Sequence, residues 1–130
     1  MNIAIRTDAS IQIGTGHVMR CLTLAEELRS RGCRILFICR AHQGHMADII
    51  TGEGFQISLL PAPEHAVEAK AQKEDYAVWL GTTQQEDASH TIEALGSENP
   101  QWLIVDHYGL DAEWEKALRQ YASQIMVIDD

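Results

Sequence analysis

Short apolar runs alternate with amphipathic stretches along the whole chain. The apolar runs have the length and branched side chains of strands, and they cover residues 1–6, 34–39, 55–60, 102–105 and 125–128. The first stretch between them repeats apolar residues at the spacing of one buried helix face: Val18, Cys21, Leu22, Ala25 and Leu28. Further helices are predicted at residues 46–52, 83–95 and 111–121. Strands that alternate with helices in this way favour a parallel sheet covered on both faces.

Glycines and capping residues mark the ends of several of these elements. Gly32 and Gly96 each follow a predicted helix, where a residue with a permissive backbone is common. Thr83 and Glu86 have the spacing of a capping box, which places a helix start at that point. The polar residues 61–75 predict a loop.

The pattern as a whole predicts a Rossmann-like three-layer α/β domain with right-handed crossovers. In such sheets ligands bind beyond the carboxyl ends of the strands. Polar clusters follow three of the predicted strands, at residues 7–17, 40–45 and 106–108. Because the carboxyl ends of parallel strands meet at one edge, we expect these clusters to converge and to form a functional site there.

The segment between the first strand and the first helix carries the strongest candidate chemistry. Gly14 and Gly16 precede His17, which falls at or near the helix N-terminus. Free backbone N–H groups and the positive end of the helix dipole favour an anionic ligand there and disfavour an imidazolium ion. A neutral imidazole near pH 7 can take a proton from water. The arrangement therefore points to chemistry on a phosphate-bearing substrate.

The glycines alone are a weak signal. Met19 stands where the dinucleotide-binding fingerprint has its third glycine, and no Gly-Lys-Ser/Thr follows, so the segment is not a P-loop. The alternative interpretation is a tight turn that requires positive φ.

Two further groups of polar residues are candidates for the same site. Arg20 lies one turn after His17, so both side chains can face one opening, although Arg20 could instead be a solvated charge. Asp106, His107 and Tyr108 directly follow the most hydrophobic strand. The alternative is that Asp106 caps a turn and His107 bonds a backbone carbonyl.

Composition limits the classes of partner. The chain has 130 residues with 45% apolar composition, enough for one domain with its own core. Its formal net charge of −9 disfavours nucleic acid, and it disfavours a nucleotide unless Arg6, Arg20 and the helix N-terminus reverse the field locally. No run is long enough to span a membrane, and the first residues form a strand instead of a signal peptide. We therefore expect a cytoplasmic location and no membrane partner.

The spacings of cysteine and histidine argue against a metal site or a disulfide framework. The cysteines form no CxxC pair and are expected to be buried or semi-buried reduced thiols: Cys21, Cys33 and Cys39. His42 and His45 have no acidic or cysteine partner at a convincing interval. His65 and His90 stand in polar surroundings, which favour the surface. We expect no metal and no cofactor.

One long segment resembles a known family. Residues 6–21, Arg6-Thr7-Asp8-Ala9-Ser10-Ile11-Gln12-Ile13-Gly14-Thr15-Gly16-His17-Val18-Met19-Arg20-Cys21, resemble the opening of the UDP-sugar hydrolases of pseudaminic acid biosynthesis. Further segments resemble the same family: Trp79-Leu80-Gly81, residues 102–111 and residues 126–130. The resemblance runs the length of the chain, and it is most specific where the first segment combines with Asp106-His107-Tyr108.

The resemblance implies a reaction and an architecture. The family hydrolyses UDP-2,4-diacetamido-2,4,6-trideoxy-β-L-altropyranose to the free sugar and UDP, and it has two Rossmann-like domains in a GT-B arrangement. Residues 1–130 then correspond to the N-terminal domain, and the C-terminal domain, which in this architecture holds most of the UDP, is absent. A chain that stops directly after a core strand agrees with this expectation. The expected partners are a UDP-sugar and the missing domain, and the isolated fragment is expected to be inactive.

The resemblance also implies roles for single residues. His17 matches the catalytic base, and Tyr108 matches a residue at the reacting sugar. Substrate contacts are expected from the remaining matched positions: Asp8, Gly14, Gly16, Arg20, Asp106 and His107. Because UDP leaves without protonation, one base that activates water is sufficient for an inverting hydrolysis. Asp8 or Asp106 would hold the other ring nitrogen of His17.

Two alternative functions remain. The first is a GT-B glycosyltransferase that passes the sugar of a nucleotide-sugar donor to an acceptor hydroxyl, and the release of free sugar without an acceptor would separate it from a hydrolase. The second is a non-catalytic nucleotide-binding module, which predicts tight binding of UDP by the isolated chain.

Overall fold

The computed structural model describes residues 1–63 and 79–128. Its elements in chain order are β1 (Asn2–Thr7), α1 (Gly16–Ser30), β2 (Arg34–Arg40), α2 (Ala47–Gly52), β3 (Gln56–Leu60), α4 (Gln84–Leu95), β4 (Trp102–Asp106), α5 (Ala112–Leu118), a 3-10 turn (Arg119–Tyr121) and β5 (Gln124–Val127). The predicted strands and helices are confirmed, and each strand end lies within one residue of its predicted position. The predicted loop at 61–75 lies largely outside the described residues.

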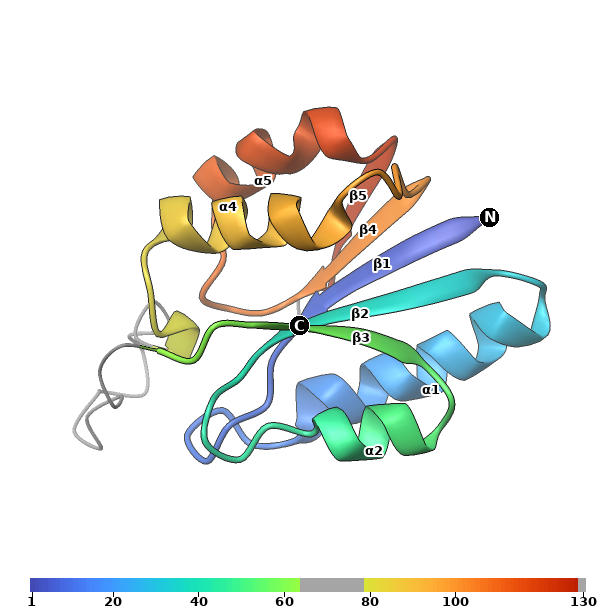
Figure 1. Ribbon diagram of the computed structural model, residues 1–130, viewed down its shortest axis with the longest axis horizontal. Helices are drawn as coiled ribbons and strands as arrows, with labels where there is room; N and C mark the ends of the chain where they lie inside the picture. The colour runs from blue at the N-terminus through green and yellow to red at the C-terminus, as the bar shows by residue number, and fades with distance from the viewer. Residues whose placement is uncertain (64–78, 129–130) are drawn as a thin grey trace.

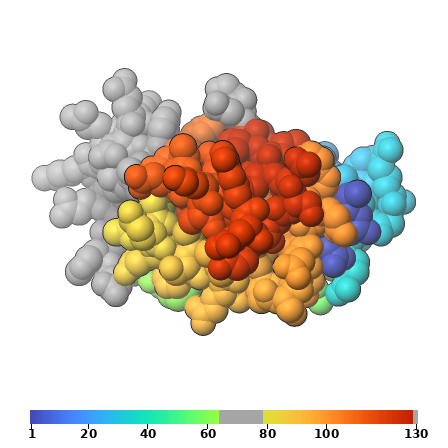
Figure 2. All heavy atoms as spheres, turned by 90° about the horizontal axis from the view of Figure 1, so that it is seen from above, coloured from blue at the N-terminus to red at the C-terminus, as the bar shows by residue number. Residues whose placement is uncertain are grey.

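The five strands form one parallel sheet in the order β3-β2-β1-β4-β5. Figure 1 shows α1 and α2 on one face of the sheet and α4 and α5 on the other. Seen from above in Figure 2, the residues of α4 (yellow to orange) and α5 (red-orange) lie side by side over that second face. The expected Rossmann-like three-layer α/β architecture is therefore confirmed.

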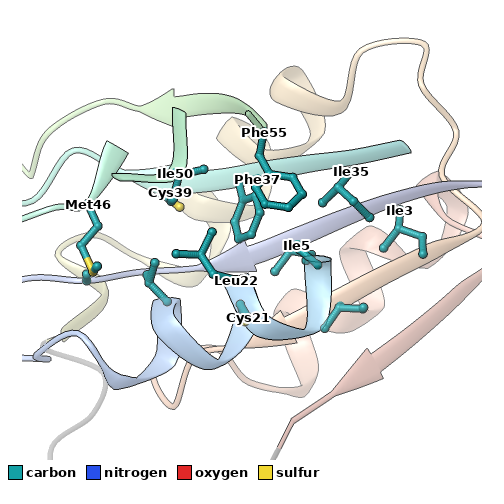
Figure 3. Close-up of a cluster of buried hydrophobic side chains, with 14 residues drawn as sticks. Ile3, Ile5, Cys21, Leu22, Ile35, Phe37, Cys39, Met46, Ile50 and Phe55 are labelled. Carbon is teal, nitrogen blue, oxygen red and sulfur yellow. The ribbon is translucent and has the colours of Figure 1, made fainter. Parts of the chain in front are cut away.

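Side chains of β1 alternate between the two faces, and each face has its own core. Ile3 and Ile5 pack with the buried residues of α1, as Figure 3 shows, while Ala4 packs with α4 and α5. In the first core the rings of Phe37 and Phe55 meet edge to face with centroids 5.4 Å apart. The predicted apolar face of α1 is buried at Val18, Cys21, Leu22 and Ala25. Because helices cover both faces, positions of the central strand β1 are buried on either side.

Two helix starts follow the capping chemistry of the sequence. Thr83 is the N-cap of α4, and its side chain accepts a hydrogen bond from the backbone N–H of Glu86, as predicted. Asp111 caps α5 by accepting from the N–H groups of Glu113 and Trp114. The helix predicted over residues 111–121 is shorter than expected, because its last turn tightens to a 3-10 turn.

Arg6 occupies an interior position on the second face, next to the apolar Ala4. Its side chain is fully buried, and its guanidinium contacts two carboxylates. Asp8 accepts at 2.6 and 3.1 Å, and Asp87 of α4 accepts at 3.2 and 2.6 Å. The expectation that Arg6 supplies positive charge to a ligand is wrong, because its donors already bind these two buried acids.

A second arginine balances the charge of this cluster. Arg40, at the end of β2, is also buried and donates from Nη2 to Asp87 at 2.8 Å and from Nη1 to the carbonyl of Pro61 at 2.7 Å. The indole of Trp114 on α5 adds a third donor to Asp87 at 2.8 Å. Two cations and two anions thus neutralise each other inside the fold, and they connect β1, β2, α4 and α5.

Residues 1–63 and 79–128 contain no helix that combines the length and the apolar composition needed to cross a bilayer.

The buried cluster predicts a large stability effect. Arg6→Met removes the cation and leaves Asp8 and Asp87 without their shared partner, so we expect the free energy of unfolding to fall by about 3–5 kcal/mol. The matched control is Arg31→Met, because Arg31 pairs with Glu27 on the exposed surface and should cost less than about 1 kcal/mol. Urea denaturation of both variants measures the difference. Equal losses in the two variants would contradict the importance of the cluster.

Candidate active site

The segments that follow β1, β2 and β4 come together at the carboxyl edge of the sheet, on the left of Figure 1. Asp8 is the residue at which they meet. Its carboxylate accepts from the backbone N–H of Arg40 at 2.7 Å and lies 3.2 Å from Nε2 of His42 and 2.9 Å from Nε2 of His107. The predicted convergence of the three polar clusters is confirmed.

The glycine segment before α1 is a compact turn. The N–H of Gly14 donates to the carbonyl of Ser10 at 2.8 Å, and the N–H of Ile13 donates to the Ser10 hydroxyl at 2.9 Å. Gly14 has a φ of 82°, which favours glycine, whereas Gly16 has no positive φ and a Cβ there would meet no atom within 4 Å. The alternative interpretation as a turn that requires positive φ therefore holds for Gly14 and fails for Gly16.

The segment after β2 packs against this turn and is hydrogen-bonded to it. The N–H of Ile11 donates to the carbonyl of Gln43 at 3.0 Å. Gly44 lies beside this contact with a φ of 89°, and a Cβ on it would stand 3.0 Å from the Ile11 nitrogen. Gly44 thus allows the close approach of the two segments that fixes the position of the turn.

His17 lies in the first turn of α1 and is oriented by the end of β4. Its Nδ1 is 2.6 Å from Oδ1 of Asp106, so of the two carboxylates considered from the sequence Asp106 makes the contact. Arg20 donates to the same carboxylate through Nε at 2.5 Å and Nη2 at 2.6 Å. In a neutral ring, an Nδ1–H that donates to Asp106 leaves Nε2 as the proton acceptor.

The electrostatics of Asp106 keep it ionised. Burial by itself raises the pKa of this carboxyl, but hydrogen bonds from Arg20 and His17 outweigh burial and lower the pKa to about 2. The thiol of Cys21 lies 3.5 Å from the same carboxylate. Burial, and then the charge of Asp106, raise the pKa of Cys21 to about 12, so this thiol is protonated at neutral pH. At neutral pH neither the ionised Asp106 nor the protonated Cys21 thiol is a strong base, so beside this carboxylate His17 is the candidate base.

Tyr108 and the helix N-terminus complete the surroundings of His17. The Tyr108 ring packs edge-on against the imidazole, with centroids 4.7 Å apart and an interplanar angle of 83°. Thr15, the N-cap of α1, makes no side-chain hydrogen bond to the helix. The N–H groups of the first turn and the positive end of the helix dipole therefore favour a negative group beside His17.

The other histidines have structural partners. His42 is buried against Asp8, and the exposed His45 accepts from the N–H of Ala47 at the start of α2. His90, which we expected at the surface, is half-buried, with its Nδ1 3.2 Å from Arg40. His65 lies outside the described residues. In the part of the chain that the structure describes, no group of three His, Cys, Asp or Glu side chains is arranged to hold a metal ion.

The structure adds one group that sequence reasoning missed. Asp87 is fully buried and joins the cluster under the site through Arg6 and Arg40. Burial raises the pKa of Asp87, but the charge and hydrogen bonds of Arg6 outweigh it and lower the pKa to about 2. A sequence signal exists, because Asp87 and Thr91 lie on the buried stripe of α4 with Ala88. A charged residue at an interior helix position indicates a buried partner.

Comparison with known proteins gives distant matches along the whole chain. No protein-family model matches the sequence. The chain is 25% identical over 131 residues to the UDP-2,4-diacetamido-2,4,6-trideoxy-β-L-altropyranose hydrolase of Campylobacter jejuni, and 24% identical over 130 residues to an uncharacterized protein of Methanocaldococcus jannaschii. It spans 37% of the length of the first relative and 22% of the second. The sequence is thus distantly similar to a UDP-sugar hydrolase.

The lowered pKa values predict acid sensitivity. Asp87 and Asp106 have pKa values of about 2 in the folded chain, below the ordinary value of 3.8, so the folded state binds fewer protons than the unfolded chain between these limits. Each contributes stability that is present above about pH 4 and is lost as pH falls towards 2, on the order of 2 kcal/mol per group. Urea denaturation at pH 7, 4 and 2.5 tests this. A free energy of unfolding that stays constant below pH 4 would contradict it.

Proposed function

We propose that this chain carries the base-bearing part of a nucleotide-sugar hydrolase, in which water attacks the anomeric carbon of a UDP-sugar. The substrate we propose is UDP-2,4-diacetamido-2,4,6-trideoxy-β-L-altropyranose, the substrate in the name of the relative from Campylobacter jejuni. The observation that supports this function best is the contact of 2.6 Å between His17 Nδ1 and Asp106 at the carboxyl edge of the sheet.

The geometry suits His17 as the general base. With Nδ1 bound to Asp106, the lone pair of Nε2 can accept a proton from water as the water attacks. The negative charge of Asp106 stabilises the positive ring that this transfer creates, as a carboxylate does for the histidine of a catalytic triad. UDP departs as a stable anion, so the reaction needs no acid at the leaving group, and a single displacement by water inverts the anomeric centre.

We propose that the diphosphate and uridine are held largely by a second domain of a GT-B arrangement. Two observations support this. The relatives extend far beyond the aligned region, since the chain spans 37% and 22% of their lengths. In the described residues, Arg6, Arg20 and Arg40 each bind a carboxylate of the chain itself, which weakens the case for a diphosphate site built from them. The chain of 130 residues alone should then lack activity.

Removal of the proposed base tests the reaction. In the polypeptide encoded by the complete reading frame, His17→Ala should lower kcat by roughly 10²- to 10⁴-fold, the usual contribution of a general base. The matched control is His45→Ala, because His45 is exposed and, among the described contacts, its side chain bonds only the backbone at the start of α2, so this variant should retain kcat within twofold. Free sugar released from the UDP-sugar without an acceptor is the measurement.

Three experimental outcomes would overturn the proposal. A kcat of His17→Ala within twofold of wild type would exclude His17 as the base. Sugar release that requires an acceptor would indicate the glycosyltransferase. Tight binding of UDP by the 130-residue chain in calorimetry, with no turnover by the full polypeptide, would indicate the binding module.

Substitution of Gly16 should affect activity, whereas substitution of Gly14 should affect stability. Gly16→Ala introduces no positive-φ strain and no contact within 4 Å, so the free energy of unfolding should change by less than about 1 kcal/mol. If the substrate lies over the start of α1, the new methyl group should nevertheless lower kcat/KM at least roughly tenfold. Gly14→Ala should cost about 1–2 kcal/mol of stability from its φ of 82°.

Thermal or urea unfolding and initial rates of both glycine variants measure these effects. A stable Gly16→Ala variant with the activity of the wild type would show that the substrate does not approach this helix start.

A further inference from the structure

The loop that carries Tyr108 is held on both sides of that residue. On one side, the ring of His107 contacts the carboxylate of Asp8, which follows β1. On the other side, the amide of Gln84 on α4 donates to the carbonyl of Gly109 at 2.6 Å and accepts from the N–H of Asp111 at 3.2 Å. The backbone around Tyr108 is therefore fixed by side chains from two other segments of the chain.

Both ring nitrogens of His107 take part in this arrangement. Nε2 lies 2.9 Å from the carboxylate of Asp8, and Nδ1 lies 2.9 Å from the backbone N–H of Gly109. A carboxylate only accepts and a backbone N–H only donates. A neutral ring with its proton on Nε2 satisfies both contacts. His107 therefore links the carboxylate of Asp8 to the backbone of Gly109, the residue after Tyr108.

Asp8 is a rigid support for this bridge. Its carboxylate accepts from Arg6 at 2.6 and 3.1 Å and from the backbone N–H of Arg40 at 2.7 Å, and its side chain is fully buried. Burial raises the pKa of Asp8, but the charge of Arg6 and the hydrogen bonds of the two histidines hold the pKa well below its ordinary value. The carboxylate that accepts the hydrogen bond from His107 is therefore ionised at neutral pH.

Two residues at and after the end of β4 contact the imidazole of His17. Asp106 binds Nδ1 of His17, and two residues later Tyr108 packs against the same ring. We infer that Asp8 and His107 are positioning residues, which hold Tyr108 against His17 and so fix the imidazole relative to the reacting carbon without contacting the substrate. This inference rests on the proposed hydrolysis and names residues that set its rate.

Two substitutions separate the contacts of His107. His107→Gln keeps an N–H that can donate to Asp8, and His107→Asn keeps an oxygen that can accept from Gly109. We expect each variant to lower kcat by roughly 10- to 100-fold with KM within about twofold, because a small displacement of a catalytic group acts on the transition state more than on binding. His45→Gln is the matched control and should retain both constants.

A measurement that needs no activity tests the packing directly. In nitrogen-15 NMR spectra of the 130-residue chain, His107 should show a proton on Nε2 alone at pH 7. The ring protons of His17 should carry a ring-current shift that disappears in Tyr108→Ala. The same shift should decrease in His107→Gln and in His107→Asn.

The outcomes separate this inference from the proposed function. Hydrolysis that is absent in the wild type would overturn the function, while the NMR shifts would still test the packing. A folded His107 variant that keeps both kcat and the His17 shift would overturn the positioning role. Wild-type His17 protons that do not respond to Tyr108→Ala would also overturn it, even if both His107 variants failed to fold.

Discussion

The burial of the Arg6 guanidinium is the constraint on which the carboxyl edge depends. A cation placed between apolar strands and helices must be neutralised inside the fold, because an unpaired buried charge costs several kcal/mol. Asp8 accepts from Nη1 and Nη2 of the guanidinium, Asp87 accepts from Nε and Nη2, and Arg40 compensates the second of these carboxylates, that of Asp87. The pairing therefore ties α4, which is distant in sequence, to the first two strands, and it fixes where the segment after β1 can run.

The candidate site is built on top of this neutral cluster. Asp8 holds His42 and His107, while Asp106, on the opposite face of the sheet, holds His17 and Arg20. Each carboxylate accepts several hydrogen bonds, so neither can reorient without the loss of all of them at once. Preorganised polar groups of this kind require little rearrangement when a reaction begins, and for this reason rigid supports under an active site favour catalysis.

Periodicity predicted the strands and helices, and parallel topology predicted that residues 7–17, 40–45 and 106–108 meet, because both follow from local patterns. The pairing of Arg6 with Asp87 was not predictable in the same way, since the two are 81 residues apart and periodicity indicates burial without naming a partner. Which carboxylate binds the His17 ring, that of Asp8 or that of Asp106, could be predicted in part. Asp106 shares a strand face with Ile104, which packs in the core under α1, so strand alternation combined with the topology places it beside that helix.

The ionisation of Asp8 and Asp106 limits the kind of leaving group that the site can serve. An enzyme that cleaves a glycosidic bond to an alcohol needs an acid that still holds its proton at neutral pH. Asp106 has a pKa of about 2, and the pKa of Asp8 lies well below its ordinary value, so neither carboxyl can donate a proton to a leaving group near neutrality. A base beside two acids that are ionised at neutral pH suits a substrate whose leaving group departs as a stable anion. A nucleoside diphosphate meets this requirement and a simple sugar alcohol does not, which supports the nucleotide-sugar substrate that we propose.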